Sequence, residues 1–114
     1  MNPITLNIAE IIGTPNAIIQ KFGNMVFEKA SKYLESGATI ILDFENISNL
    51  TSGFCNASIG KLYSTFPKIA DSNIIVTHIE KSSIWHEKIQ ESIDLVKNPD
   101  KAKKIDDAIL ALFQ

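Results

Sequence analysis

Apolar and polar positions along the chain follow two different periods, and the periods alternate. Apolar residues alternate with polar ones over residues 4–8, which predicts a half-buried strand at or near a sheet edge. The mainly apolar stretch over residues 38–44 is typical of a strand covered on both faces, and residues 74–79 form a second stretch of this buried type. The sequence therefore predicts three strands.

Helical spacing fills the intervals between these strands. Thr14-Pro15 predicts a helix start, with threonine as the cap, and Gly37 is well placed to end that helix after about Glu35. Three more helices are expected over residues 52–64, from Ser82 or Ser83 to residue 97, and over residues 99–113. All four predicted helices have an apolar stripe. In chain order, the stripes contain Ile18, Phe22, Met25, Val26, Ala30, Tyr33 and Leu34, then Cys55, Ile59 and Leu62, then Trp85, Ile89, Ile93 and Val96, then Ala102, Ile105, Ile109 and Leu112.

The resulting order, β-α-β-α-β-α-α, predicts one α/β domain over residues 1–114 with a small, mostly parallel sheet packed against helices. The strand over residues 38–44 should lie in the middle. Three strands make a small sheet, and one of its faces is left for the last helix or for another subunit.

Composition and charge exclude several classes of partner. The chain has 114 residues and a net charge of −2, and all eleven basic residues are lysine. Without arginine, bidentate recognition of guanine or phosphate is impossible within this chain. No apolar run approaches the roughly 18 residues of a membrane span, and Met1-Asn2-Pro3 lacks the pattern of a signal peptide. We expect a cytoplasmic protein that binds neither nucleic acid nor membrane.

Two adjacent hydroxyl residues, Thr51 and Ser52, lie where the second long helix should begin. They are either an ordinary helix cap or a phospho-acceptor, because the N-terminus of a helix favours a phosphate. We expect a partner-binding face around them, with Phe54 as a partly exposed aromatic residue. The other residues that we expect in this binding face are Asn46, Ser48, Asn49 and Gly53.

Catalytic and metal-binding patterns are weak. Asp43 ends the middle strand, on the side of the sheet where ligands gather, and could serve as a base, a metal ligand or a loop cap. Cys55, His78 and Asp43 together suggest a hydrolase, but Cys55 also lies on the apolar stripe of its helix. His78 and His86 have no cluster of ligands around them in the sequence, and no glycine-rich phosphate-binding loop occurs. We therefore expect no catalytic residue, no cofactor and no metal.

Short motifs give the chain a family resemblance. Leu42-Asp43-Phe44, followed by Leu50-Thr51-Ser52-Gly53, resembles the strand end and switch loop of STAS domains, the sulfate-transporter and anti-sigma-factor-antagonist modules. Asp43-Phe44, Ser52-Gly53-Phe54 and Gly60-Lys61-Leu62 resemble more closely the STAS-like group of unknown function, the DUF4325 type. The resemblance implies a non-enzymatic regulatory or scaffold module, in some cases beside a kinase-like ATPase, with Ser52 at the phospho-acceptor position.

Three hypotheses remain open at this point. The first is a STAS-like protein-interaction switch that contacts a protein partner around Ser52. The second is a small cytoplasmic enzyme with a strand-end pocket formed by Cys55, His78 and Asp43. The third is a structural homo-oligomer that assembles through an uncovered sheet face.

Overall fold

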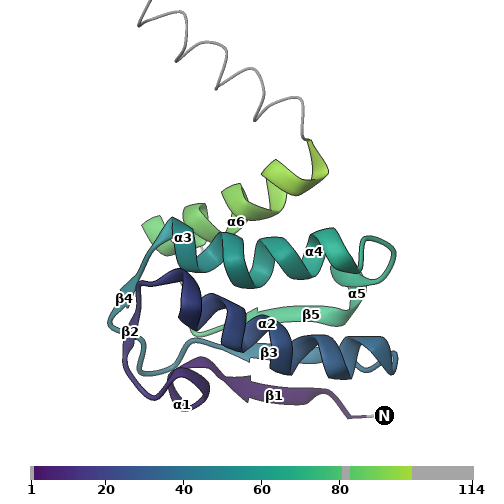
Figure 1. Cartoon of the computed structure of the whole chain (residues 1–114), viewed down its shortest axis with the longest axis horizontal. Coiled ribbons are helices and arrows are strands. Elements are labelled where there is room, and N and C mark those ends of the chain that lie inside the picture. Colours follow the sequence, from purple (N-terminus) through teal and green to yellow (C-terminus); the bar gives the residue numbers. More distant parts are fainter. Residues whose placement is uncertain (1, 81–82, 99–114) are drawn as a thin grey trace, which may run out of the picture.

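A three-stranded parallel sheet forms the base of the domain (Figure 1). The computed structural model describes residues 2–80 and 83–98. Strand β1 (Ile4–Asn7) pairs with β3 (Ile40–Asp43), and β3 pairs with β5 (Ile74–Thr77), so that β3 lies in the middle. The predicted α/β class, the parallel sheet and its central strand are therefore confirmed.

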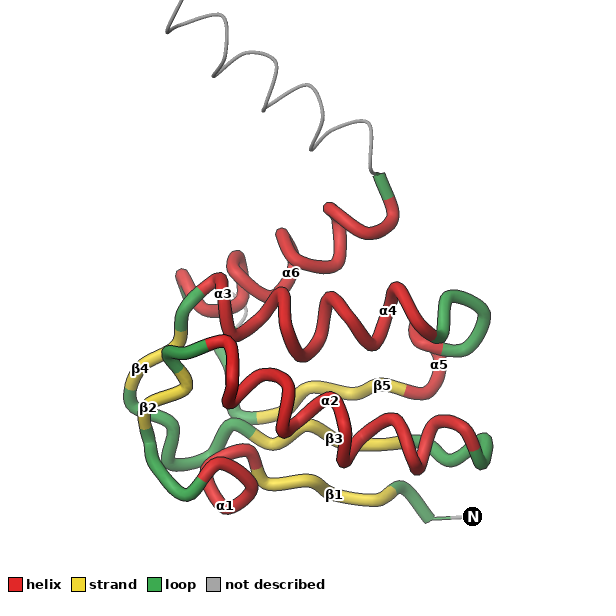
Figure 2. The backbone as a smooth tube through the Cα atoms, viewed as in Figure 1, coloured by secondary structure: helices red, strands yellow, loops and turns green. Residues whose placement is uncertain are grey.

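Helices and one short additional strand pair complete the fold (Figure 2). Strands β2 (Asn16–Ala17) and β4 (Asn49–Leu50) pair in parallel beside the main sheet. The helices are α1 (Ile8–Ile12), α2 (Gln20–Glu35), α3 (Ser52–Cys55), the π-helical turn η1 (Asn56–Gly60), α4 (Lys61–Thr65), α5 (Ala70–Asn73) and α6 (Ile84–Lys97). None of the helices in the described part of the chain has the length and apolar character needed to cross a membrane.

The two faces of the main sheet differ. On one face, Leu6, Ile40 and Leu42 are buried in the core beneath the helices. On the other face Thr5 and Ile75 are exposed and Ile41 is only partly buried. The expectation that the middle strand is covered on both faces is thus wrong for the described residues. An apolar residue is tolerated on this face at Ile41 because β3 lies between two strands, and its paired residues Thr5 and Ile75 partly shield Ile41 from solvent. The helix predicted over residues 99–113 lies outside the described residues.

Helix α2 begins later than the sequence predicts. Thr14 accepts a hydrogen bond from the backbone N–H of Asn16 instead of capping a helix. The carbonyl oxygen of Pro15 accepts hydrogen bonds from the N–H groups of Ser48 and Asn49, which lie far along the chain. This pairing keeps residues 15–19 out of a helix, so α2 starts only at Gln20 and Ile18 becomes 46% exposed. A long-range pairing has overridden a local helix-start signal.

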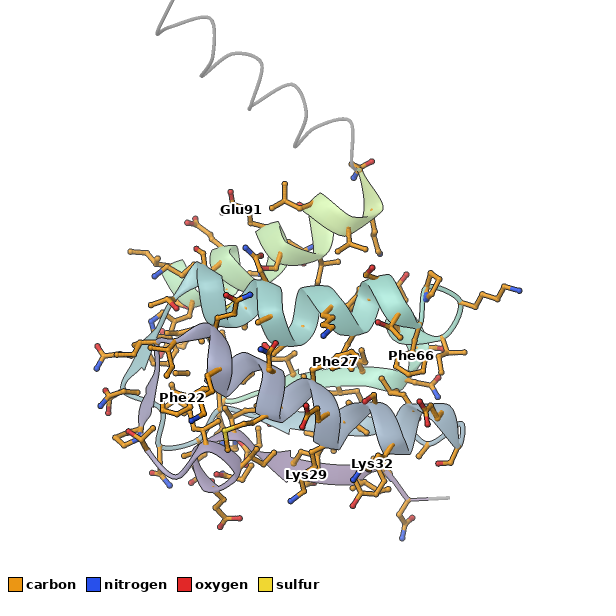
Figure 3. All side chains as sticks on the ribbon, in the orientation of Figure 1. Phe22, Phe27, Lys29, Lys32, Phe66 and Glu91 are labelled. Atoms are coloured by element: carbon orange, nitrogen blue, oxygen red, sulfur yellow. The ribbon has the colours of Figure 1, made fainter. Side chains whose placement is uncertain are left out.

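The predicted helix over residues 52–64 is present as one continuous run, α3–η1–α4, from residue 52 to residue 65. It packs closely on α2 at Gly23, where an added Cβ would lie 2.7 Å from both the carbonyl oxygen of Phe54 and the Cβ of Ala57. Further along, Phe27 and Phe66 lie between α2 and α4, whereas Lys29 and Lys32 extend from the other side of α2 (Figure 3).

Helix α6 begins where the sequence indicated. Ser83 is the cap, and its side chain accepts a hydrogen bond of 3.1 Å from the backbone N–H of His86. Ile89 and Ile93 are buried, and α6 packs against η1 and α3. A side-chain hydrogen bond of 2.6 Å between Ser92 and Asn56 joins the two layers of helices.

Candidate functional site

Thr51 organises the start of α3. Its hydroxyl accepts a hydrogen bond from the backbone N–H of Phe54 at 3.3 Å, as an N-cap does, and donates one to the carbonyl oxygen of Ile18 at 3.0 Å. Its backbone N–H donates to the carbonyl oxygen of Ala17 at 3.1 Å. Thr51 therefore fixes the helix start against the strand that leads into α2, and its role as a helix cap is confirmed.

Exposed residues surround this link. Ser52 and Gly53 form the exposed first turn of α3. Ile18 and Ile19, at the start of α2, are 46% and 43% exposed, which is unusual for such large apolar side chains. Asn49 is also exposed and donates a hydrogen bond to Asn16 across the β2–β4 pair. We call Ile18, Ile19, Asn49, Ser52 and Gly53 the Ser52 face.

The other predicted binding residues fall into two groups. Asn46 and Ser48 are exposed in the loop after β3. Phe54 is fully buried, so the expectation of a partly exposed aromatic residue is wrong. With Thr51 as the cap, the first turn directs Ser52 and Gly53 to solvent and Phe54 and Cys55 to the core. Ile18 was missed because the sequence placed it on the buried stripe of the first helix, and Ile19 was not singled out at all.

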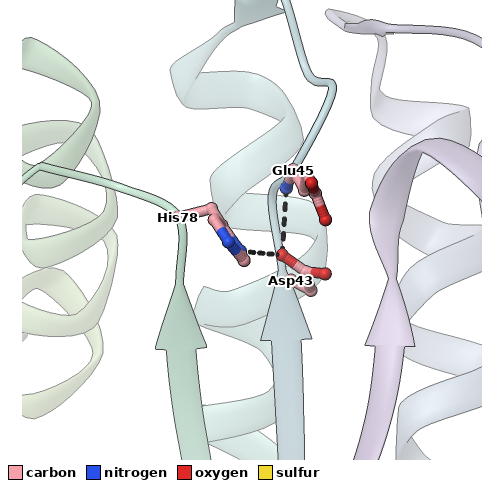
Figure 4. A group of neighbouring side chains, drawn as sticks. All are labelled: Asp43, Glu45 and His78. Carbon is pink, nitrogen blue, oxygen red and sulfur yellow. Dashed lines mark hydrogen bonds and ion pairs between the residues drawn. The ribbon is translucent and has the colours of Figure 1, made fainter.

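A second group of polar residues lies at the carboxyl ends of β3 and β5. The ring nitrogen Nδ1 of His78 donates a hydrogen bond to the Asp43 carboxylate, which also accepts one from the backbone N–H of Glu45 (Figure 4). Thr77 donates to the same oxygen at 3.3 Å. Asp43, Glu45 and His78 each offer one ligand atom within 4.8 Å of the others. The sequence grouped Asp43 and His78 only within the hypothesis of a pocket shared with Cys55, and their contact results from the register that aligns Asp43 with Thr77.

The Asp43 carboxylate is ionised at neutral pH. Burial acts to raise its pKa, but the hydrogen bonds from the Glu45 backbone and from His78, together with the charge of His78, lower the pKa below its ordinary value. Asp43 is thus a buried anion held by its neighbours, which is consistent with the loop role that the sequence suggested.

Cys55 lies apart from this group and is fully buried. Burial raises the pKa of its thiol to about 12, with a small opposing effect from Lys88. Because the thiolate is the nucleophile, a thiol of this kind is unreactive at neutral pH. The structure brings His78 to Asp43 but does not bring Cys55 to either.

We therefore expect Cys55 to react with an aromatic disulfide reagent much more slowly in the folded protein than in urea. Cys55 is the only cysteine, so the absorbance of the released thiolate belongs to it alone. Reaction in the native state as fast as in urea would restore the hypothesis of a cysteine enzyme.

Of three comparisons with known proteins, one found a match. A search of curated proteins and a search of solved structures each found no match to the chain. The family model of the STAS-like domain of unknown function (DUF4325) matches residues 23–83, which is more than half of the chain. The match includes β3, the loop after it, Ser52 and β5. The chain belongs to the DUF4325 family of STAS-like domains.

Proposed function

We propose that the domain is a non-enzymatic regulatory module of the cytoplasm, and that its Ser52 face binds a protein partner, with a kinase-like ATPase as the first candidate. One observation carries the proposal. The exposed hydroxyl residue at the first turn of α3 lies beside an exposed isoleucine pair from a distant segment, and the Thr51 hydroxyl bonds the two segments together. Membership of a STAS-like family supports it.

The composition of the Ser52 face suits protein recognition. Ile18 and Ile19 supply exposed apolar area, and Asn49 and Ser52 supply exposed polar groups. Interfaces combine an apolar centre with a polar rim in this way. The link from Thr51 to Ile18 holds the two parts in place before a partner arrives, which lowers the cost of ordering them on binding.

Ser52 is the better phospho-acceptor of the two hydroxyl residues. The Thr51 hydroxyl both donates and accepts a hydrogen bond, so its phosphorylation would break the link to Ile18. The Ser52 side chain is exposed, and it makes no hydrogen bond to another described residue. A phosphate there would add nearly two negative charges at the positive end of a continuous helix, with little cost to the fold.

We expect Ser52→Asp to leave the thermal midpoint unchanged or slightly raised and to weaken partner binding, since it brings a charge into the interface. Ser52→Ala should change stability by less than about 1 kcal/mol, because Thr51 and not Ser52 is the cap. The measurement is the affinity of each variant for the purified partner, identified first by capture from cells, together with its thermal midpoint.

Ser64→Asp is the matched control. Ser64 is an exposed serine of the same helix, about three turns further along. It should leave the affinity unchanged if the Ser52 face is the interface. Equal affinity of wild type and Ser52→Asp, at unchanged thermal midpoint, would leave Ser52 as a plain surface residue and would move the interface elsewhere.

One observation favours a second function, the assembly of copies of this chain through a face of the main sheet. On the sheet face that no described residue covers, Ile75 is 44% exposed, and an exposed apolar residue there suits a subunit that assembles through this face. If that face joins two copies, the mass of the protein in solution rises with concentration, and Ile75→Asp abolishes the rise.

A further inference from the structure

The group at the carboxyl ends of β3 and β5 has no role in partner binding as described above. Within residues 2–80 and 83–98 it is the one place where three histidine, cysteine or acidic side chains bring ligand atoms within 4.8 Å of one another. From this arrangement we propose that Asp43, Glu45 and His78 bind a divalent transition-metal ion, best fitted by Zn²⁺.

The donor set selects the class of metal. One imidazole nitrogen and two carboxylate oxygens are ligands that Zn²⁺ accepts, at about 2 Å from the ion. Mg²⁺ and Ca²⁺ prefer oxygen ligands only and need more of them, so a site containing His78 disfavours both. With three protein ligands, a fourth position stays open to water.

The charges around the group favour a cation. The Asp43 carboxylate is buried, and Glu45 adds a second carboxylate at the surface. No lysine in the described part of the chain lies within ion-pair distance of either acid. Among the described residues, His78 is the one basic side chain within ion-pair distance of Asp43.

The ligands are held and accessible in the way that a binding site requires. Hydrogen bonds from the Glu45 backbone and the Thr77 hydroxyl fix Asp43, as outer partners do around a metal ligand. The side chain of His78 is 56% exposed, so an ion can enter from solvent. The two non-glycine residues with positive φ among the described ones are Asn46, at 69°, and His78, at 62°, and both are at this site.

Binding through Nδ1 changes which nitrogen of the His78 ring carries a hydrogen. In the metal-free protein this nitrogen donates to Asp43. A neutral ring would bind the ion through Nδ1 as the tautomer with its hydrogen on Nε2, so the hydrogen moves from Nδ1 to Nε2, whereas a protonated ring would release its Nδ1 proton to solvent. The ion would also join the end of β5 to the loop that follows β3.

The test is a titration of the purified domain with Zn²⁺. Calorimetry measures the heat of binding, and NMR spectra record the signals of the histidine rings. We expect one ion per chain, with changes at the ring nitrogens of His78 and none at His86, which lies outside the group. Co²⁺ should give a visible absorption band, and Mg²⁺ at the same concentration should give no heat.

Variants decide which residues bind the ion. Glu45→Gln and His78→Gln should each weaken Zn²⁺ binding at least about tenfold, since loss of a mere outer partner of a metal ligand already costs that much, whereas His86→Gln leaves it unchanged. Glu45 and His78 are both exposed, so these variants should fold, and circular dichroism checks that they do. The proposal is overturned by absence of Zn²⁺ binding, by binding that survives either variant, or by an equal loss in His86→Gln.

Discussion

Leu42→Asp is expected to unfold the domain. Leu42 lies in the middle strand with none of its surface exposed, between Leu6 on one side and Val76 on the other. An unpaired carboxylate at such a position costs several kcal/mol, against a total stability of about 5–15 kcal/mol for a typical domain. Loss of the amide dispersion in NMR spectra and of the cooperative thermal transition measures the effect.

The control for this prediction is Ile75→Asp. It places the same charge in the neighbouring strand, but on the uncovered face, where Ile75 is 44% exposed. This variant should keep a cooperative transition. A folded Leu42→Asp protein would contradict the position of β3 at the centre of the core.

Gly23→Ala is expected to destabilise the domain by about 2 kcal/mol, because overpacking outweighs the better helix propensity of alanine. The new methyl group would meet the carbonyl oxygen of Phe54 and the Cβ of Ala57, both at 2.7 Å, and a backbone atom cannot rotate away. Urea unfolding of the variant measures the change in the free energy of unfolding.

Gly60→Ala is the control, because Gly60 belongs to the helix on which Gly23 packs but faces Ser92 of α6. Gly60 has helical dihedral angles, and the nearest atom to an added Cβ is 3.5 Å away. Its stability should stay equal or rise by up to about 1 kcal/mol. Equal effects at the two glycines would show that α2 and η1 do not approach as closely as described.

Much of the fold follows from the sequence, because strands and helices leave different periods in it. The apolar run at β3 and the alternation at β1 were sufficient to place a central and an edge strand. The start of α2 could not be predicted in the same way. Thr14-Pro15 is a sound local signal, but the pairing of Pro15 with Ser48 and Asn49 depends on segments brought together only by folding.

The candidate sites show the same limit. The helix start at Thr51 was visible as a pair of hydroxyl residues, and the structure confirms the cap. The contact between Asp43 and His78 depends on strand register, which no local pattern reports. A signal did exist, since polar residues that end two adjacent parallel strands meet at one edge of the sheet. The burial of Phe54 was missed because the cap residue decides which way the first turn faces.

The most direct test of the central claim is to map the interface on the domain itself. Amide chemical shifts of the ¹⁵N-labelled domain are recorded as the purified, unlabelled partner is added. We expect the largest changes at residues 18–20 and 48–53, the segments that the Thr51 hydroxyl joins. Changes confined to the uncovered sheet face, at Thr5, Ile41 and Ile75, would contradict the Ser52 face as the binding surface.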